Sequence, residues 1–151
     1  MNFPILSSLI LLPTIGALFL FFTKNKEEKN FTAKYVSLFT SIVNFLISIY
    51  LWIYFDQSTS NFQFIEDREW INGFINYKIG VDGISILFII LTTFITPLCI
   101  ISVNNTIKTR LRDFLIAILI MESFMIGVFC ALDLVVFYLF FEAGLIPMFL
   151  I

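Results

Sequence analysis

Five long apolar runs constrain the fold of this chain more than any other feature. They lie near residues 3–22, 35–55, 84–103, 114–132 and 134–151. A hydrocarbon layer of about 30 Å takes about 20 helical residues to cross, and each run has roughly that length. Because 60% of the 151 residues are apolar, a soluble domain of this size could not bury them all. The sequence therefore predicts an all-α, polytopic membrane protein with five transmembrane helices.

The charged residues indicate how these helices are oriented. Only 13% of the residues are charged, and all except Glu122 and Glu142 lie in or beside the segments between the runs. Seven of the nine basic residues fall in the connections 23–34 and 104–113: Lys24, Lys26, Lys29, Lys34, Lys108, Arg110 and Arg112. Because basic loops stay on the inner side of a membrane, we expect these two connections inside and the N-terminus outside.

The connection 56–82 is the only long one, and we expect it to be an external loop. It contains the remaining basic residues, Arg68 and Lys78, among more numerous acids. Phe62-Gln-Phe64 is its candidate short strand. Trp70, Tyr77 and Lys78 near its end are typical of residues that anchor a chain at a membrane interface.

Three local patterns indicate how the helices begin and pack. Asp82 and Asp133 stand just before the third and fifth runs, where an acidic side chain can accept hydrogen bonds from the free amides of a helix start. Gly127-x-x-x-Ala131 in the fourth run is typical of a close contact between membrane helices. We expect all three to be structural.

Several kinds of chemistry have no support in the sequence. The chain has no His. Cys99 and Cys130 are predicted near opposite membrane faces as small buried residues, not as a disulfide. No Cys/His cluster indicates a metal site, and Gly80-Val-Asp-Gly83 lacks the third glycine of a nucleotide-binding loop. We expect no metal, nucleotide, flavin or nucleic acid on this chain.

Glu122 and Glu142 are the candidate functional residues, because each lies inside an apolar run. A charge at mid-membrane costs about 2.5–3.5 kcal/mol on insertion scales, so such residues indicate an ion or proton pathway. Glu122 lies eleven residues before Asp133 and Glu142 nine after it, so on adjacent antiparallel helices their depths differ by only about 3 Å. Either the two carboxylates face each other and share a proton, or each pairs with a basic residue beyond 151.

Two of the prolines within the predicted helices, Pro97 and Pro147, lie near polar residues. Pro147 cannot donate to the carbonyl of Ala143, the residue after Glu142. That open carbonyl fits either a chain of water molecules beside the acid or an ordinary packing kink. Pro97 leaves the Thr93 carbonyl open in a hydroxyl-rich stretch, whose hydroxyls we expect to bond their own backbone.

From about residue 75 onward, several strings together resemble one known family. They are Tyr77–Ser85, Leu91–Ile100, Met121–Phe129 and Ala131–Met148, and the most specific is Phe140-Phe-Glu142-x-x-Leu-Ile-Pro147-Met. The resemblance is to subunit M of the proton-pumping NADH:quinone oxidoreductases, which is chain 4 of mitochondrial complex I. Residues 1–74 agree with that family only in hydropathy and orientation.

The resemblance implies a longer, antiporter-like bundle with two inverted five-helix repeats that begin at the fourth helix. Residues 1–113 would then be three N-terminal transmembrane helices with an external loop at 56–82. Residues 114–151 would be the truncated start of the first repeat. In the family a fifth-helix glutamate works with a lysine on a later helix in proton translocation, a role that falls on Glu142 here. Glu122 matches a commonly acidic fourth-helix position and is the candidate second carboxylate.

The function implied is that of a complex I membrane subunit, in a bacterial or mitochondrial inner membrane, that takes part in proton translocation coupled to quinone reduction. NADH, FMN, iron–sulfur clusters and quinone would belong to other subunits. The expected partners are other membrane subunits, the lipid bilayer and protons. Two alternatives stay open: a stand-alone cation/proton antiporter subunit, and a non-catalytic remnant. Because Ile151 lies inside the fifth run, we expect a fragment or a frameshifted remnant.

Overall fold

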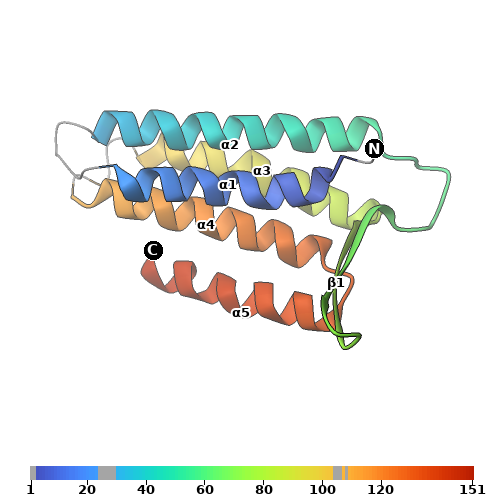
Figure 1. Ribbon diagram of the computed structural model, residues 1–151. Helices are drawn as coiled ribbons and strands as arrows, with labels where there is room; N and C mark the ends of the chain where they lie inside the picture. The colour runs from blue at the N-terminus through green and yellow to red at the C-terminus, as the bar shows by residue number, and fades with distance from the viewer. Residues whose placement is uncertain (1–2, 24–29, 104–106, 108) are drawn as a thin grey trace.

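The described part of the chain forms a bundle of five helices with a β-hairpin at one end (Figure 1). The computed structural model describes residues 3–23, 30–103, 107 and 109–151. The helices are α1 (Ile5–Phe22), α2 (Asn30–Ile53), α3 (Gly83–Ser102), α4 (Leu111–Cys130) and α5 (Leu134–Leu150). The first four are long and apolar enough to cross a membrane, and α5 is a shorter apolar helix of 17 residues. The prediction of a helical membrane bundle is confirmed.

Successive helices run in opposite directions, so the chain ends and connections sort to two sides (Figure 1). The ends of α1 and α3 lie with the starts of α2 and α4, on the side where the two basic connections are predicted. The start of α1 lies at the other side, with the hairpin. Helices α2 and α4 begin five and three residues earlier than predicted, so Lys34 and Arg112 are helical. Lys24, Lys26, Lys29 and Lys108 lie outside the described residues, and the inside orientation stays a prediction.

The connection 56–82 contains more regular structure than the sequence indicates. Strands β1 (Gln63–Ile71) and β2 (Ile75–Val81) pair antiparallel, with Asp67 opposite Lys78. The short strand expected at Phe62-Gln-Phe64 was therefore wrong in its bounds, because β1 begins at Gln63 and continues to Ile71. Four consecutive charged residues, 66–69, fill the middle of β1, and such residues are depleted in strands.

The hairpin is bonded to the starts and ends of several helices. Glu66 of β1 accepts hydrogen bonds from the first amides of α1, at Leu6 (3.1 Å) and Ser7 (3.2 Å), and from the Ser7 hydroxyl. The amide of Leu132, in the link between α4 and α5, donates to the carbonyl of Lys78 in β2 (3.0 Å). Strand β2 also leads almost directly into α3. The hairpin thus ties one end of the bundle together.

Both predicted helix caps are confirmed. The Asp82 side chain accepts from the Ser85 amide at 2.7 Å at the start of α3. The Asp133 side chain accepts from the Val135 amide at 2.8 Å at the start of α5. Each carboxylate satisfies an amide that has no partner within its own helix.

The bundle interior has two separate apolar clusters. The hairpin-side cluster consists of Leu6, Leu9, Ile10, Leu51, Ile79, Val81, Ile86, Ile89, Ile126 and Cys130. The opposite cluster consists of Ala17, Leu20, Ala33, Ile100, Val103, Leu111, Leu115, Ile118 and Leu119. On each of α1 to α4, the residues of one cluster are separated along the helix from those of the other. This leaves a middle level of the bundle that neither cluster fills.

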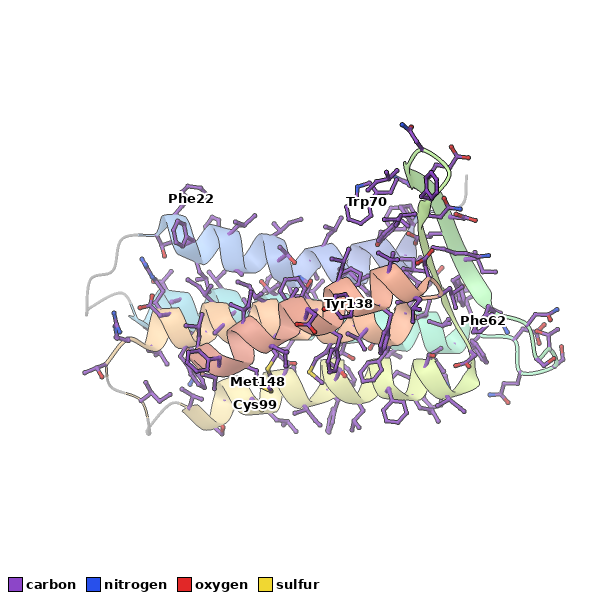
Figure 2. All side chains as sticks on the ribbon, turned by 90° about the horizontal axis from the view of Figure 1, so that it is seen from below. Phe22, Phe62, Trp70, Cys99, Tyr138 and Met148 are labelled. Carbon is purple, nitrogen blue, oxygen red and sulfur yellow. The ribbon has the colours of Figure 1, made fainter. Side chains whose placement is uncertain are left out.

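The outer surface is apolar along the helices, as expected of a protein whose surroundings are lipid and other membrane helices. Figure 2 shows side chains projecting all around, with Phe22 at one end of the bundle and Phe62 and Trp70 at the hairpin end. Trp70 is exposed, in keeping with its predicted interfacial place. Tyr77 is half-buried instead, with its hydroxyl 3.4 Å from that of Ser7.

Candidate functional site

Polar side chains from four helices meet at the middle of the bundle, between the two apolar clusters. We call this set the mid-bundle polar layer: Thr14 of α1, Asn44 and Ser48 of α2, Thr93 of α3, and Glu122 and Ser123 of α4. All of them except Thr14 are buried. A polar group inside a membrane bundle is stable only when it finds a partner there.

Glu122 is the only charged-type side chain in this layer, and it is 1% exposed. Its Oε1 accepts a hydrogen bond of 2.9 Å from Nδ2 of Asn44, across the contact between α4 and α2. The remaining oxygens of the two side chains, Oε2 of Glu122 and Oδ1 of Asn44, are buried without a hydrogen-bond partner among the described residues. The pair is therefore only half satisfied.

Hydroxyl groups make the other contacts of the layer. Ser48 and Thr93 lie 2.8 Å apart and join α2 to α3, and Thr14 and Ser123 lie 2.8 Å apart and join α1 to α4. The Ser123 hydroxyl also donates to the carbonyl of Ile10. Interhelical hydrogen bonds of this kind hold membrane helices together.

The hydroxyl-rich stretch of α3 behaves as predicted. Thr92, Thr93 and Thr96 each place their hydroxyl on a carbonyl one turn earlier in the same helix, at distances of 2.8, 3.0 and 3.0 Å. The structural interpretation of this stretch is confirmed. Thr93 does more than predicted, because it also contacts Ser48.

Glu142 has different surroundings from Glu122. It lies on the exposed side of α5 and lines a shallow surface hollow of about 610 Å³. The other lining residues are all apolar and all from α5: Leu139, Ala143, Leu145, Ile146, Phe149 and Leu150. Within the described ranges no hydrogen bond or ion pair reaches this carboxylate. Pro147, whose position leaves the Ala143 carbonyl open, is buried.

The structure does not bring the two carboxylates together. Phe140 and Gly144 are two positions of α5 that meet α4: a Cβ on Gly127 would lie 2.7 Å from the Phe140 ring, and one on Gly144 would lie 3.7 Å from Phe124. Glu142 is two residues from both, which turns it about 200° away from this contact. Glu122 meanwhile bonds to α2. The alternative of different neighbours thus fits, although the neighbour of Glu122 is Asn44 and not a basic residue beyond 151. The predicted close approach at Gly127 is confirmed.

The remaining candidate ligand residues are dispersed. Cys130 is buried as predicted, but Cys99, at the opposite end of the bundle, is exposed, so its predicted burial was wrong. Both are free thiols. In the part of the chain that the structure describes, no three His, Cys, Asp or Glu side chains come close enough to hold a metal ion.

The polar face of α2 was not predicted. Ser37, Ser41, Asn44 and Ser48 follow one another at intervals of four, three and four residues, and all four are fully buried. That spacing places them on one helix face. The pattern is present in the sequence, but it contains no charged residue and is less conspicuous than Glu122 or Glu142.

Comparisons with known proteins agree with this architecture. The family described as "NADH-ubiquinone oxidoreductase chain 4, amino terminus" matches residues 8–128. NADH-ubiquinone oxidoreductase chain 4 of Marchantia polymorpha is 46% identical over 147 residues, which is 97% of this chain and 29% of the relative. NADH-quinone oxidoreductase subunit M of Rhodobacter capsulatus is 58% identical over 119 residues, 79% of this chain and 23% of the relative. Subunit M of Rickettsia conorii is 42% identical over 155 residues, 100% of this chain and 31% of the relative.

The chain spans less than a third of the length of these curated relatives. The family match covers α1 to almost the end of α4. The alignment with the Marchantia relative extends over 97% of the chain. With a family match over most of its residues, the chain belongs to the NADH-ubiquinone oxidoreductase chain 4 family, as the strings between Tyr77 and Met148 had indicated.

Proposed function

We propose that this chain serves as a membrane subunit of NADH:quinone oxidoreductase and takes part in proton translocation coupled to quinone reduction. The names of its relatives and its apolar bundle support this proposal. Its membrane would be a bacterial or mitochondrial inner membrane. NADH, FMN, iron–sulfur clusters and quinone would be bound by other subunits, so this chain would move protons without transferring electrons.

The observation that supports the proposal most is the place of Glu142, an acid on the exposed apolar side of α5. A carboxylate at mid-membrane is costly unless it is paired or protonated. Because the hollow beside Glu142 opens away from α4, the partner of this acid would come from a neighbouring helix. Other membrane subunits or further helices of the same bundle are the proposed neighbours.

The proposed mechanism uses a cation near Glu142 to change its affinity for a proton. A positive charge close to a carboxylate favours the ionised form, so its approach releases the proton and its withdrawal lets the carboxylate take one up. The open carbonyl of Ala143, produced by Pro147, would hold a water molecule on the route to the acid. Glu122 would be a second carboxylate with a smaller contribution to proton translocation.

The test is Glu142→Gln in the intact complex, with proton pumping measured in vesicles during NADH oxidation. We expect a loss of pumping, and a milder loss for Glu142→Asp, which keeps the charge with a shorter reach. Pumping at near-normal levels in Glu142→Gln would refute the role of this residue. Sodium-dependent proton exchange without NADH-linked activity would point to a stand-alone antiporter instead.

A further inference from the structure

The contact between Asn44 and Glu122 has two hydrogen-bond acceptors left over. Asn44 donates from Nδ2 to Oε1 of Glu122 at 2.9 Å. Oδ1 of Asn44 and Oε2 of Glu122 are both buried with no donor in the described residues. An ionised carboxylate can only accept hydrogen bonds, so in that form it could not supply the donor that Oδ1 lacks.

No charge in the described helices compensates for a charge on Glu122. Helices α1 and α3 contain no charged residue within their bounds. Lys34 of α2 and Arg112 of α4 each lie ten residues from the pair along their helix, which is about 15 Å. On α5, Glu142 points away. An isolated charge in such an apolar interior is strongly unfavourable.

A single proton on Oε2 would satisfy both unpaired oxygens. A carboxylic acid and a carboxamide can join through two parallel hydrogen bonds, one in each direction. Here Nδ2 of Asn44 would donate to Oε1, as it does, and the acid O–H on Oε2 would donate to Oδ1. We propose that Glu122 is a neutral acid held by Asn44 in such a two-bond pair, so that Asn44 is a positioning residue for its proton.

This pair couples the proton of Glu122 to the contact between α2 and α4. Loss of the proton would set two acceptor oxygens, Oε2 and Oδ1, against each other, and the contact would become repulsive. Separation of the helices, conversely, would remove the only donor that Oε1 has among the described residues. Proton release and opening of the mid-bundle polar layer are therefore one event. The proposal does not depend on the role of Glu142.

The test is infrared spectroscopy on the intact complex in membranes at neutral pH. The spectrum of the unmodified protein minus that of Glu122→Gln is expected to show the carbonyl stretch of a protonated, hydrogen-bonded acid, and no carboxylate bands. The glutamine variant is suited to this comparison because its amide can make both bonds of the pair and keep the fold. Carboxylate bands in the difference spectrum would overturn the proposal.

Substitution of Asn44 tests the second half of the inference. Asn44→Leu removes the donor to Oε1, so the acid carbonyl stretch is expected to shift to higher frequency. Asn44→Ser is less disruptive, and the same shift of the carbonyl stretch can be measured in it if the leucine variant does not assemble. Ser48→Ala is the matched control: it removes a neutral contact one turn away on α2, that with Thr93, and should leave the band in place. An unmoved band in the Asn44 variants, or an equal shift in Ser48→Ala, would contradict the role of Asn44.

Discussion

Glu122 and Glu142 are the same residue type at similar depth on neighbouring helices, yet they have opposite surroundings. Glu122 is enclosed by α1 to α4 and bonds to Asn44. Glu142 lies on the outside of α5, with apolar residues of its own helix around it. Depth along a helix can be counted from the sequence, but the direction of a side chain depends on which face the neighbouring helices cover.

The two helices that hold these glutamates differ in the same way. Ten residues of α4 are buried, spread along its length, whereas only Val136 and Pro147 are buried on α5. A helix that is apolar all around is normally covered by protein or lipid on every side. Most of the buried side chains therefore belong to the four-helix unit α1–α4, and α5 lies at its edge with one face against α4.

The largest expected effect is the difference in proton pumping between variants of the two glutamates. Glu142→Gln should lower NADH-driven proton pumping strongly, since removal of a positioned proton-transfer group typically costs about 10²-fold or more in rate. Glu122→Gln should cost much less, because glutamine reproduces the contacts of a neutral acid. Parallel pumping assays on vesicles with equal amounts of assembled complex measure both. A larger loss of pumping in Glu122→Gln than in Glu142→Gln would contradict the contrast between the two glutamates.

The contact between α4 and α5 is tested by a pair of glycines. Gly127→Ala places a Cβ 2.7 Å from the Phe140 ring, and overpacking of this kind costs about 1–3 kcal/mol. Gly144→Ala is the control, since its Cβ meets Phe124 at an ordinary 3.7 Å. We expect a lower thermal unfolding midpoint for the first variant alone, restored in part by Phe140→Leu. Equal midpoints would mean that α5 does not pack on α4 as described.

A smaller loss of stability in the four-helix unit is expected from a substitution at the hairpin end of α1. Glu66→Gln keeps the shape of the side chain but weakens its bonds to the Leu6 and Ser7 amides, since charge-assisted hydrogen bonds are the stronger ones. We expect a loss of about 1 kcal/mol, at the low end because the site is half exposed. Hydrogen exchange should accelerate at the start of α1 and not in α5. Glu69→Gln, at an exposed position of the same strand, should change neither.

A similarly small effect is expected for the cap of α3. Hydrogen bonds from the Ser85 amide and hydroxyl lower the pKa of Asp82 below its ordinary value of 3.8. The stabilisation is therefore complete above the unfolded-state pKa and disappears as the pH falls through the lower, folded-state pKa. Asp82→Ala should cost about 1 kcal/mol at neutral pH, and Asp82→Asn should remove this acid sensitivity. Unfolding midpoints measured from pH 6 down to about 2 test both statements.

Asp133→Ala is the corresponding cap substitution for α5. It removes the same kind of bond, to the Val135 amide, from a helix with few buried residues. We expect faster hydrogen exchange that is confined to α5, whereas Asp82→Ala should loosen α3 within the four-helix unit. Exchange that spreads from α5 into α4 would show that the edge is more firmly integrated than its burial indicates.

Much of the fold could be predicted from local pattern. The lengths of the apolar runs predicted the helices. Asp82 and Asp133 indicated two helix caps and Gly127 indicated a close helix contact, and the structure confirms all three. These features depend on residues close in sequence or on one helix face. The hairpin was underestimated because its strand β1 is charged in the middle, and its stability comes from bonds to α1 and to the α4–α5 link.

The candidate site was harder to predict. Glu122 and Glu142 stand out as charges in apolar runs, but Asn44 lies 78 residues from its partner and is not unusual on its own. Only the rotation of α2 against α4 brings the two side chains together. The i, i+4, i+7, i+11 spacing from Ser37 to Ser48 indicated a polar face, whereas its partner helix could not be read from one sequence.

The attachment of the hairpin has a mechanical consequence for the bundle. Glu66 fixes the beginning of α1, β2 runs into α3, and Leu132 fixes the turn between α4 and α5. A tilt of the hairpin would therefore move the start of α1, the start of α3 and the α4–α5 link together, while the far ends of α1 and α4 are held by a separate bond, from the Arg112 guanidinium to the Thr23 carbonyl.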